Sequence, residues 1–342
     1  MRRALAYFLF GIASCAFALE LAFRLLPVST STNTGYAVDS AIVTYPPHHE
    51  FRTATGWDLR NAYLQRSNNY GFLTSRDFGP QADAVALIGD SYVEASMLPE
   101  EARLGPQLER LLDGRPVYVL GGPGSNLLDY AERIRFAAER FGIHDFVVLI
   151  ERGDVLQSLC GSRNIHSQCL DATTLAPRVE KLAPPGTLKR LIRHSALAQY
   201  LFSQLKLDPA KLFNSRHVLP APSEARAALN ASATPSLAAA DTIVHTFFSR
   251  IQPYATGRLV LIVDGVRERA SSEKARPDEV RARFMAYAAT RGALVVDMEP
   301  IFRRFMQDTG LNLSVSPSDQ HWNPAAIRLA AEEVAPVLSK KQ

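Results

Sequence analysis

The sequence has little of what metal-binding and nucleic-acid-binding proteins usually need. Its 342 residues include three cysteines, and none of these has a Cys-x-x-Cys or Cys/His spacing typical of zinc. The formal net charge is only +4, and no run of lysine and arginine interleaved with aromatic residues follows the N-terminus. His48 and His49 adjoin a proline pair, which is typical of a surface turn. We therefore expect no metal, no other cofactor and no nucleic-acid partner.

The first 26 residues form a long apolar stretch. Arg2 and Arg3 precede it, and Glu20 and Arg24 are the charged residues near its end. The stretch is long enough to cross a bilayer if the two late charges reach the far headgroups. The N-terminal arginines would remain in the cytoplasm and place the rest of the chain outside it. We expect residues 1–26 to be an uncleaved single-pass anchor in the inner membrane, with the following domain in the periplasm.

Two other interpretations of this segment remain open. Ala16-Phe17-Ala18 resembles the small-residue site at which a secretory signal peptide is cleaved. Ile12 to Cys15 is close to the lipobox of a bacterial lipoprotein, although the residues after Cys15 stay apolar where a polar tether would normally begin. The uncleaved anchor is favoured over both.

The rest of the chain has the pattern of an α/β domain. Its 47% hydrophobic content allows one substantial core plus an insertion or subdomain. Residues 27–80 show no clear helical periodicity and are expected to be an irregular, ordered lead-in. Beyond them, apolar strands alternate with amphipathic helices, which predicts right-handed crossovers and a parallel sheet. Strands are expected at 84–88, 117–120, 146–150, 258–264 and 293–297, and helices at 103–112, 127–141 and about 278–291.

Residues 155–240 interrupt this alternation and are interpreted as an insertion over the sheet edge. The main domain is then divided into 81–154 and 241–342. A basic amphipathic helix is expected over 188–207, with a solvated face favoured and lipid headgroups or an acidic glycan as alternative partners. A Pro-, Ala- and Ser-rich passage over 217–240 offers little that would pack.

Cys160 and Cys169 lie close together within this insertion. If the N-terminal segment anchors the chain as expected, both cysteines are in an oxidising compartment. A gap of eight residues between them closes easily. We predict a Cys160–Cys169 disulfide, with Cys15 left free.

Three segments far apart in the sequence carry the groups of a nucleophilic hydrolase. The run Ala84 to Ile88 ends in Gly89-Asp90-Ser91, so Ser91 is expected at the carboxyl edge of a buried strand, where open α/β sheets hold their active sites. A glycine-rich turn, Gly121 to Gly124, follows the next strand, and its backbone N–H groups suit an oxyanion. Asp319 and His321 precede the last helix.

These residue types together can perform acyl transfer. A serine hydroxyl becomes a good nucleophile only when a base takes its proton, and His321 suits that role. Asp319, two residues away, can hold the other ring nitrogen in the correct tautomer. Each part also has an ordinary explanation, as a helix cap, a glycine turn or a surface histidine. Their combination at expected sheet-edge positions favours a catalytic site.

The same segments resemble the sequence blocks of SGNH/GDSL-type hydrolases, especially the membrane-anchored cell-envelope branch that includes alginate and peptidoglycan O-acetylation proteins. Gly89 to Tyr92 (GDSY) matches the first block, and Leu120 to Gly124 (LGGPG) resembles the second. Asp319 to Asn323 (DQHWN) matches the DxHW form of the last block. Asn68 to Phe72 (NNYGF) resembles a segment found upstream of GDS in anchored members. The resemblance covers about residues 60–335, the insertion excepted.

This resemblance implies a flavodoxin-like three-layer α/β fold with a parallel sheet, the SGNH hydrolase fold. Ser91 would be the nucleophile, His321 the base and Asp319 the orienting acid. The backbone amides of Ser91 and Gly121, or of a neighbouring glycine such as Gly124, would bind the oxyanion. The implied activity is that of a serine esterase or O-acyltransferase acting through an acyl-enzyme on an acylated cell-envelope polysaccharide or a small ester. The alternative is a non-catalytic glycan-binding or assembly protein on the same scaffold.

One block departs from the family pattern. The third block is normally GxND, with the asparagine side chain as an oxyanion donor, whereas here Gly153 occupies the asparagine position. Asn126 and Arg152 are the nearest candidates for a replacement donor. Asn126 is favoured, because it has amide chemistry and because strand alternation can turn the Arg152 side chain into the sheet.

Overall fold

The chain divides into two compact units, each assembled from separate stretches of sequence. The computed structural model describes residues 2–30, 33–162, 167–183, 186–187, 190, 193–205, 207, 237–269, 278–317 and 319–339. Unit 1 comprises Met1–Asn33, Glu50–Arg66 and Ala183–Ser232, and unit 2 comprises Thr34–His49, Ser67–Leu182 and Ala233–Gln342. The lead-in expected at 27–80 and the insertion expected at 155–240 therefore each contribute residues to both units.

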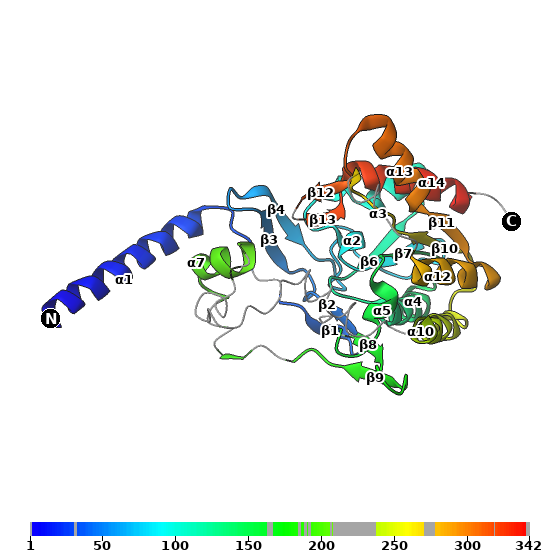
Figure 1. Cartoon of the computed structure of the whole chain (residues 1–342), viewed down its shortest axis with the longest axis horizontal. Coiled ribbons are helices and arrows are strands. Elements are labelled where there is room, and N and C mark those ends of the chain that lie inside the picture. The colour runs from blue at the N-terminus through cyan, green and yellow to red at the C-terminus, as the bar shows by residue number, and fades with distance from the viewer. Residues whose placement is uncertain are drawn as a thin grey trace. The chain divides into compact units, whose positions relative to one another are not determined.

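Unit 2 is built on a five-stranded parallel sheet with the strand order β11-β10-β7-β5-β6 (Figure 1). The strands are β5 (Val85–Gly89), β6 (Val117–Gly121), β7 (Asp145–Ile150), β10 (Leu259–Val263) and β11 (Leu294–Asp297). The central strands are apolar along nearly their whole length because both faces of the sheet are covered. The predicted α/β class and parallel sheet are confirmed.

Helices cover both faces of this sheet and give it three layers (Figure 1). Alternate residues of β5 show the division, because Ala86 and Ile88 belong to one core cluster and Val85 and Leu87 to the other. The first face packs against α4 (Leu127–Phe141), α10 (Leu237–Ile251) and α12 (Glu279–Thr290). The second packs against α3 (Leu104–Leu111), α13 (Met298–Thr309) and α14 (Pro324–Ser339).

Helix α10 was not expected from the sequence. It begins at Leu237, within the passage 217–240 that we expected to pack little, and residues 217–236 lie outside the described residues. Ala239 and Ala240 are buried in its first turn, and Phe247 is buried further along. The helix begins with small alanines that pack into the core. Because a run of alanines is also common in linkers, the sequence does not indicate that this segment is a buried helix.

The lead-in contains two β-hairpins rather than irregular chain. In unit 2, β1 (Gly35–Asp39) pairs with β2 (Ile42–Thr44). In unit 1, β3 (Glu50–Thr55) pairs with β4 (Arg60–Arg66). β2 is buried along its whole length, whereas β1 is mostly half-buried and β3 and β4 each contain one buried residue. None of these short strands shows a clear alternation of buried and exposed residues that the sequence could reveal.

The long basic helix expected at 188–207 is not a single helix. Thr187 and Arg190 are helical, residues 193–194 form a turn, and helical structure resumes with α7 (Ala196–Ala198) and continues as the π-helical turn η2 (Gln199–Gln204). Ser195 is the N-cap of α7, and its hydroxyl accepts a hydrogen bond from Ala198 N at 3.1 Å. Lys189 lies outside the described residues. The helical periodicity of the sequence could not reveal this local cap.

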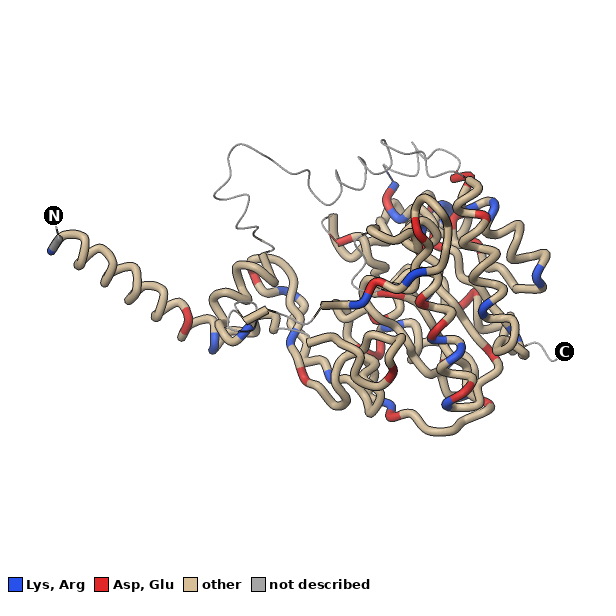
Figure 2. Tube along the Cα trace, turned by 90° about the horizontal axis from the view of Figure 1, so that it is seen from below, with Lys and Arg blue, Asp and Glu red and all other residues tan. Residues whose placement is uncertain are grey.

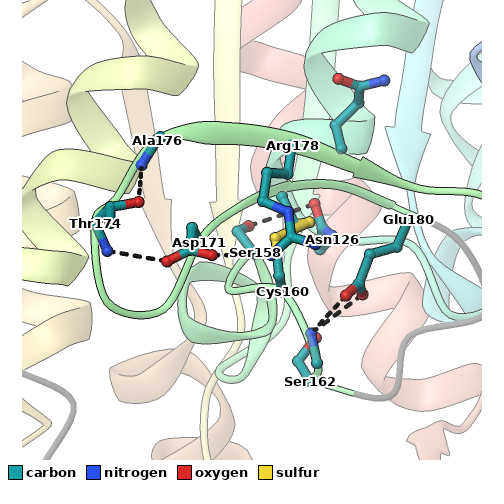
Figure 3. The surroundings of a disulfide bond; sticks show 12 residues. Asn126, Ser158, Cys160, Ser162, Asp171, Thr174, Ala176, Arg178 and Glu180 are labelled. Carbon is teal, nitrogen blue, oxygen red and sulfur yellow. Dashed lines mark hydrogen bonds and ion pairs between the residues drawn. A yellow bond between two sulfur atoms is a disulfide. The ribbon is translucent and has the colours of Figure 1, made fainter.

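The predicted Cys160–Cys169 disulfide is present, with the two Cα atoms 5.1 Å apart (Figure 3). Cys160 follows the short helix α5 (Asp154–Gln157), and Cys169 lies in β8 (Ser167–Leu170), which pairs with β9 (Pro177–Glu180). The Glu180 carboxylate accepts a hydrogen bond from Gly161 N at 3.1 Å, next to the bridge. The disulfide therefore ties the β8–β9 hairpin to the chain that leaves β7. Cys15 is free and exposed.

The N-terminal helix α1 (Arg2–Leu25) is long and apolar enough to cross a membrane. None of the residues in its apolar window is buried against the rest of the chain. Membrane anchors and signal sequences both have these properties.

Candidate active site

Ser91 lies two residues after the carboxyl end of β5, where it begins the short helix α2 (Ser91–Glu94). Asp90 is the N-cap, and its carboxylate accepts a hydrogen bond from Tyr92 N at 2.8 Å. Gly89 is required at the bend, because a Cβ there would lie 2.5 Å from Val93 Cγ2. The result is a half-buried serine at the sheet edge, as predicted.

Asp319 and His321 lie in β13 (Asp319–Trp322), which pairs with β12 (Ser314–Ser316) just before α14. His321 Nε2 is 2.8 Å from Ser91 Oγ, and His321 Nδ1 is 2.5 Å from Asp319 Oδ1. Asp319 Oδ1 also accepts a hydrogen bond from the His321 backbone N at 3.1 Å. The structure thus brings the three predicted residues into one hydrogen-bonded chain.

This geometry suits removal of the serine proton. A neutral imidazole that donates from Nδ1 to Asp319 has a free lone pair on Nε2, which faces Ser91 Oγ. All three side chains are partly exposed, so an ester can reach the serine. A serine, a histidine and an aspartate at these distances can attack an acyl carbon and stabilise the imidazolium that forms.

The glycine turn after β6 packs against α2. In the sheet Gly121 is in register with Gly89, and a Cβ on Gly121 would lie 2.6 Å from Glu94 N. Gly122 N donates to Gly89 O at 3.2 Å, so this amide is already used within the protein. Gly124 has a φ of 71°, which a side chain would strain. The close packing positions the Gly121 end of β6 beside the helix that starts at Ser91.

Asn126 is the N-cap of α4 and is fully buried. Its Oδ1 accepts hydrogen bonds from Leu128 N at 2.9 Å and Asp129 N at 3.1 Å. Within the described part of the chain, its Nδ2 has no hydrogen-bond partner. A buried amide donor without a partner is costly, so it is a reasonable candidate for a group that meets a ligand.

Arg152 has other partners. Its guanidinium pairs with Asp278 Oδ2 at 3.4 Å and Glu299 Oε2 at 3.9 Å. Gly153, in the position of the missing asparagine, donates its N–H to Glu151 Oε2 at 2.6 Å. These contacts favour Asn126 over Arg152 as the replacement donor.

A buried ion pair that the sequence did not reveal is bonded to β13, the strand that carries His321. Asp264, directly after β10, accepts hydrogen bonds from Trp322 Nε1 at 2.8 Å and from Arg267 Nη1. Trp322 is the residue after His321, so this contact fixes the end of β13 to the end of β10. The strand that carries His321 is therefore attached to the edge of the parallel sheet by the buried side chain of Trp322.

Tyr92 links the same ion pair to the serine side of the site. The Arg267 guanidinium lies over the Tyr92 ring, 5.0 Å from its centre. Tyr92 in turn contacts the His321 ring and donates from its hydroxyl to Gln320 O at 3.1 Å. Tyr92, next to Ser91 in the sequence, therefore connects the helix that carries Ser91 with the strand that carries His321 and with the Asp264–Arg267 ion pair.

A second buried contact holds α2 from the other end. The Tyr45 hydroxyl donates to the Glu94 carboxylate at 2.9 Å, and both side chains are buried. Burial raises the pKa of Glu94. Tyr45 N donates to Gly71 O at 3.0 Å, and Asn68 Oδ1 accepts from Phe72 N at 3.0 Å. The NNYGF segment thus forms a turn that holds the backbone of Tyr45 by a hydrogen bond.

Carboxyl groups follow three neighbouring strands at this edge. Asp90, Glu151 and Asp264 come directly after β5, β7 and β10, and all three are buried. Burial, together with repulsion from Glu151, raises the pKa of Asp90 to about 6. Burial also raises the pKa of Asp154, whose Oδ2 accepts hydrogen bonds from Glu151 N and Tyr130 Oη. Ionisation of Asp90 near neutral pH therefore costs free energy in the folded protein.

The grouping of possible metal ligands found among the described residues consists of Cys160, Cys169 and Glu180. Its two sulfurs are joined in the disulfide, so they cannot act as thiolate ligands.

No family model and no curated relative matches the chain. Among solved structures, it is similar to a member of the lipolytic G-D-S-L family from Veillonella parvula (12% identity; 75% of this chain and 99% of that one; TM-score 0.41). It is also similar to a catalytic mutant of an acetylxylan esterase from Geobacillus stearothermophilus (12% identity; 77% and 96%; TM-score 0.42). A third is the α/β hydrolase LAE5 from the metagenome of Lake Arreo (15% identity; 77% and 98%; TM-score 0.39).

Replacing Asp264 by alanine is expected to lower the free energy of unfolding by about 3–5 kcal/mol, because the buried Arg267 would lose its carboxylate partner. The double variant Asp264→Ala/Arg267→Met should lose much less, since methionine still packs on Tyr92 and carries no charge. Urea titrations followed by far-UV circular dichroism measure both values. An equal loss in the single and the double variant would show that the ion pair is not the source of the effect.

The raised pKa of Asp90 predicts a pH-dependent effect of Asp90→Asn. The folded protein binds the Asp90 proton more tightly than the unfolded chain does, so wild-type stability falls as the pH rises from about 4 through about 6. A shift from 3.8 to about 6 corresponds to about 3 kcal/mol. The amide oxygen introduced by Asp90→Asn can still cap α2, because asparagine and aspartate are equally good N-caps. The variant should therefore be more stable than wild type at pH 8 and equal to it below pH 4.

The measurement is a urea titration at several pH values, followed by the emission of the buried Trp322 in a Trp57→Phe background. A stability difference that does not change between pH 4 and pH 8 would contradict the assigned burial of a charged Asp90.

Proposed function

We propose that this protein is a serine esterase or O-acyltransferase that acts on an acylated cell-envelope glycan or a related ester. The observation that carries the proposal is the hydrogen-bonded chain Ser91–His321–Asp319 at the carboxyl edge of β5. Its geometry supports formation of an acyl-enzyme without a cofactor.

In the first half-reaction, Ser91 Oγ attacks the acyl carbonyl carbon while its proton passes to His321 Nε2. Asp319 stabilises the imidazolium through Nδ1. Collapse of the tetrahedral intermediate breaks the ester C–O bond, and the leaving alcohol oxygen takes the proton from His321. The acyl group is then an ester of Ser91.

In the second half-reaction, His321 Nε2 removes a proton from the acceptor, whose oxygen attacks the acyl carbon of the acyl-enzyme. Collapse of this second tetrahedral intermediate breaks the bond between the acyl carbon and Ser91 Oγ, and His321 returns the proton to Ser91 Oγ. With water as acceptor the reaction is hydrolysis, and with a sugar hydroxyl it is O-acyl transfer. The oxyanion formed in both halves is bound by the Ser91 and Gly121 backbone N–H groups, with Asn126 Nδ2 as the third donor.

The cell envelope is the proposed location. Helix α1 supports an inner-membrane anchor, and the Cys160–Cys169 disulfide supports an oxidising, periplasmic compartment for unit 2. An ester-bearing envelope polysaccharide is then the substrate class at hand.

The second candidate is a glycan-binding or assembly protein without catalytic activity. Gly153 in place of the third-block asparagine favours it, because an oxyanion with one donor fewer is formed about a hundredfold or more slowly. The retained Ser91–His321–Asp319 chain favours the enzyme.

Labelling with a fluorophosphonate probe followed by intact-mass analysis separates these two functions. The wild-type protein should gain one probe adduct, and Ser91→Ala or His321→Ala should lose labelling and at least about a thousandfold in ester hydrolysis. Ser339→Ala is the control, because the Ser339 hydroxyl bonds to Ala335 O within α14. A wild-type protein that does not label, or a Ser91→Ala variant with near-wild-type turnover, would refute the enzyme assignment.

The third oxyanion donor is tested with Asn126→Ser and Arg152→Met. Serine preserves an N-cap acceptor for α4 but has no amide donor, so kcat should fall about a hundredfold while the fold persists. Arg152→Met should leave kcat near wild type, because Arg152 is paired with Asp278 and Glu299. If neither change matters and Gly153→Asn raises kcat, the natural site lacks a third donor.

A further inference from the structure

The last turns of α1 are bonded into unit 1 through Glu20. Its carboxylate accepts hydrogen bonds from Ala196 N at 3.0 Å and Leu197 N at 2.9 Å, and from the Ser195 hydroxyl at 2.8 Å. It therefore caps the start of α7. Arg24 pairs with Glu20 at 2.8 Å. The apolar helix thus ends within a folded unit, not in a loose tether.

The tip of the β3–β4 hairpin is tied to the same turns. The ring of Tyr200 stacks on Phe23 with centres 4.1 Å apart, and the Tyr200 hydroxyl donates to Trp57 O at 2.9 Å. Gln204 adds a second link, since Ser29 N donates to its Oε1 at 3.0 Å and its Nε2 donates to Gly56 O at 2.9 Å. Trp57 is consequently held close to the end of α1.

The Trp57 side chain points outward from this assembly, with 76% of its surface exposed. Tryptophan side chains are mostly buried in folded proteins, as Trp322 is here with 1% of its surface exposed. Two cations lie at the same end of α1: Arg24 donates to His194 O at 3.5 Å, and Arg193, the residue before His194, donates to Asn33 Oδ1 at 2.8 Å. We call Trp57, Arg24 and Arg193 the interfacial collar.

The dimensions of α1 place the collar at one side of a bilayer. Arg3 and Phe23 are about 30 Å apart along an α-helix, which matches the hydrocarbon thickness of about 30 Å. Figure 2 shows α1 free of charged positions between its N-terminal tip and its last turns, with both acidic and basic positions beyond. If Arg3 lies at one headgroup layer, then Phe23 and the Tyr200–Trp57 contact lie at the other.

We propose that the interfacial collar is a lipid-binding surface that docks unit 1 onto the bilayer spanned by α1. Trp57 lies at the boundary between headgroups and acyl chains, where indole rings are favoured because one end is apolar and the N–H can bond to polar groups. Arg24 and Arg193 bind the phosphates of anionic phospholipids. This surface orients unit 1 at the membrane and does not depend on the proposed catalytic activity.

The test uses the full-length protein in vesicles of phosphatidylcholine and phosphatidylglycerol. The difference in emission between wild type and Trp57→Phe isolates Trp57, because the remaining Trp322 is buried in both proteins. Lipids brominated near the headgroup end of the chain should quench Trp57 more than lipids brominated near the chain terminus. Aqueous iodide should quench Trp57 less in vesicles than in a detergent-solubilised sample.

The arginines are tested with Arg24→Gln/Arg193→Gln in the same vesicles. Each removed charge should lower the ratio of docked to undocked Trp57 about fivefold, and the loss should disappear in vesicles without the anionic lipid. Arg328→Gln is the matched control, because Arg328 is exposed on α14 in unit 2. Fluorophosphonate labelling of all variants in detergent shows whether unit 2 and its proposed activity are intact.

Two results would overturn the proposal. One is a membrane-retained protein in which Trp57 is quenched fully by iodide and not by brominated lipid. The other is a mature chain that begins near Leu19 and is released without detergent, because the collar requires α1 as its anchor.

Discussion

The hydrogen bond between Ser91 Oγ and His321 Nε2 joins two residues 230 positions apart, and much of unit 2 is arranged so that it can form. Ser91 is positioned by the end of β5, and His321 by the strand β13 just before α14. Helix α14 is buried along Ile327, Ala330 and Val334 against the same face of the sheet as α3. A slip of α14 by one turn, about 5.4 Å, would separate the pair completely. The packing of an apolar helix thus determines a polar contact at its N-terminal end.

The carboxyl edge of the sheet combines this contact with several buried charges. Asp90, Glu151 and Asp264 follow apolar strands and lie near the buried guanidinium groups of Arg133 and Arg267. Burying such groups costs stability unless they are paired. Arg267 pairs with Asp264, and Arg133 donates a hydrogen bond to Gly89 O at 2.9 Å. Trp322, which follows His321, is fixed by its hydrogen bond to Asp264, and Tyr92 packs against both the His321 and Trp322 rings. The raised pKa of Asp90 measures part of that cost.

In unit 1, a partly exposed carboxylate is also held by several hydrogen bonds. Glu20 interrupts an apolar helix at a position where a charge would be costly in lipid, yet its carboxylate caps α7. The apolar helix is therefore joined to folded chain by directed hydrogen bonds. The hairpin tip that carries Trp57 shares this connection through Tyr200, so the proposed membrane contact would be coupled to the folding of unit 1.

The sequence by itself determined the parallel α/β sheet, the position of Ser91 at the end of β5 and the Cys160–Cys169 disulfide. These follow from local features: apolar runs bounded by glycine, and two cysteines separated by a short loop. It also identified Asp319 and His321, because the family-like motif keeps them two residues apart. It failed for residues 188–207, where the chain turns before Ala196, and for α10, whose small alanines suggested a linker. Only the tertiary structure decided which polar groups meet, since Asp264 with Trp322, Tyr45 with Glu94 and Glu20 with α7 are pairs distant in sequence. No local periodicity encodes such pairs, because each is set by the register in which helices and hairpins pack.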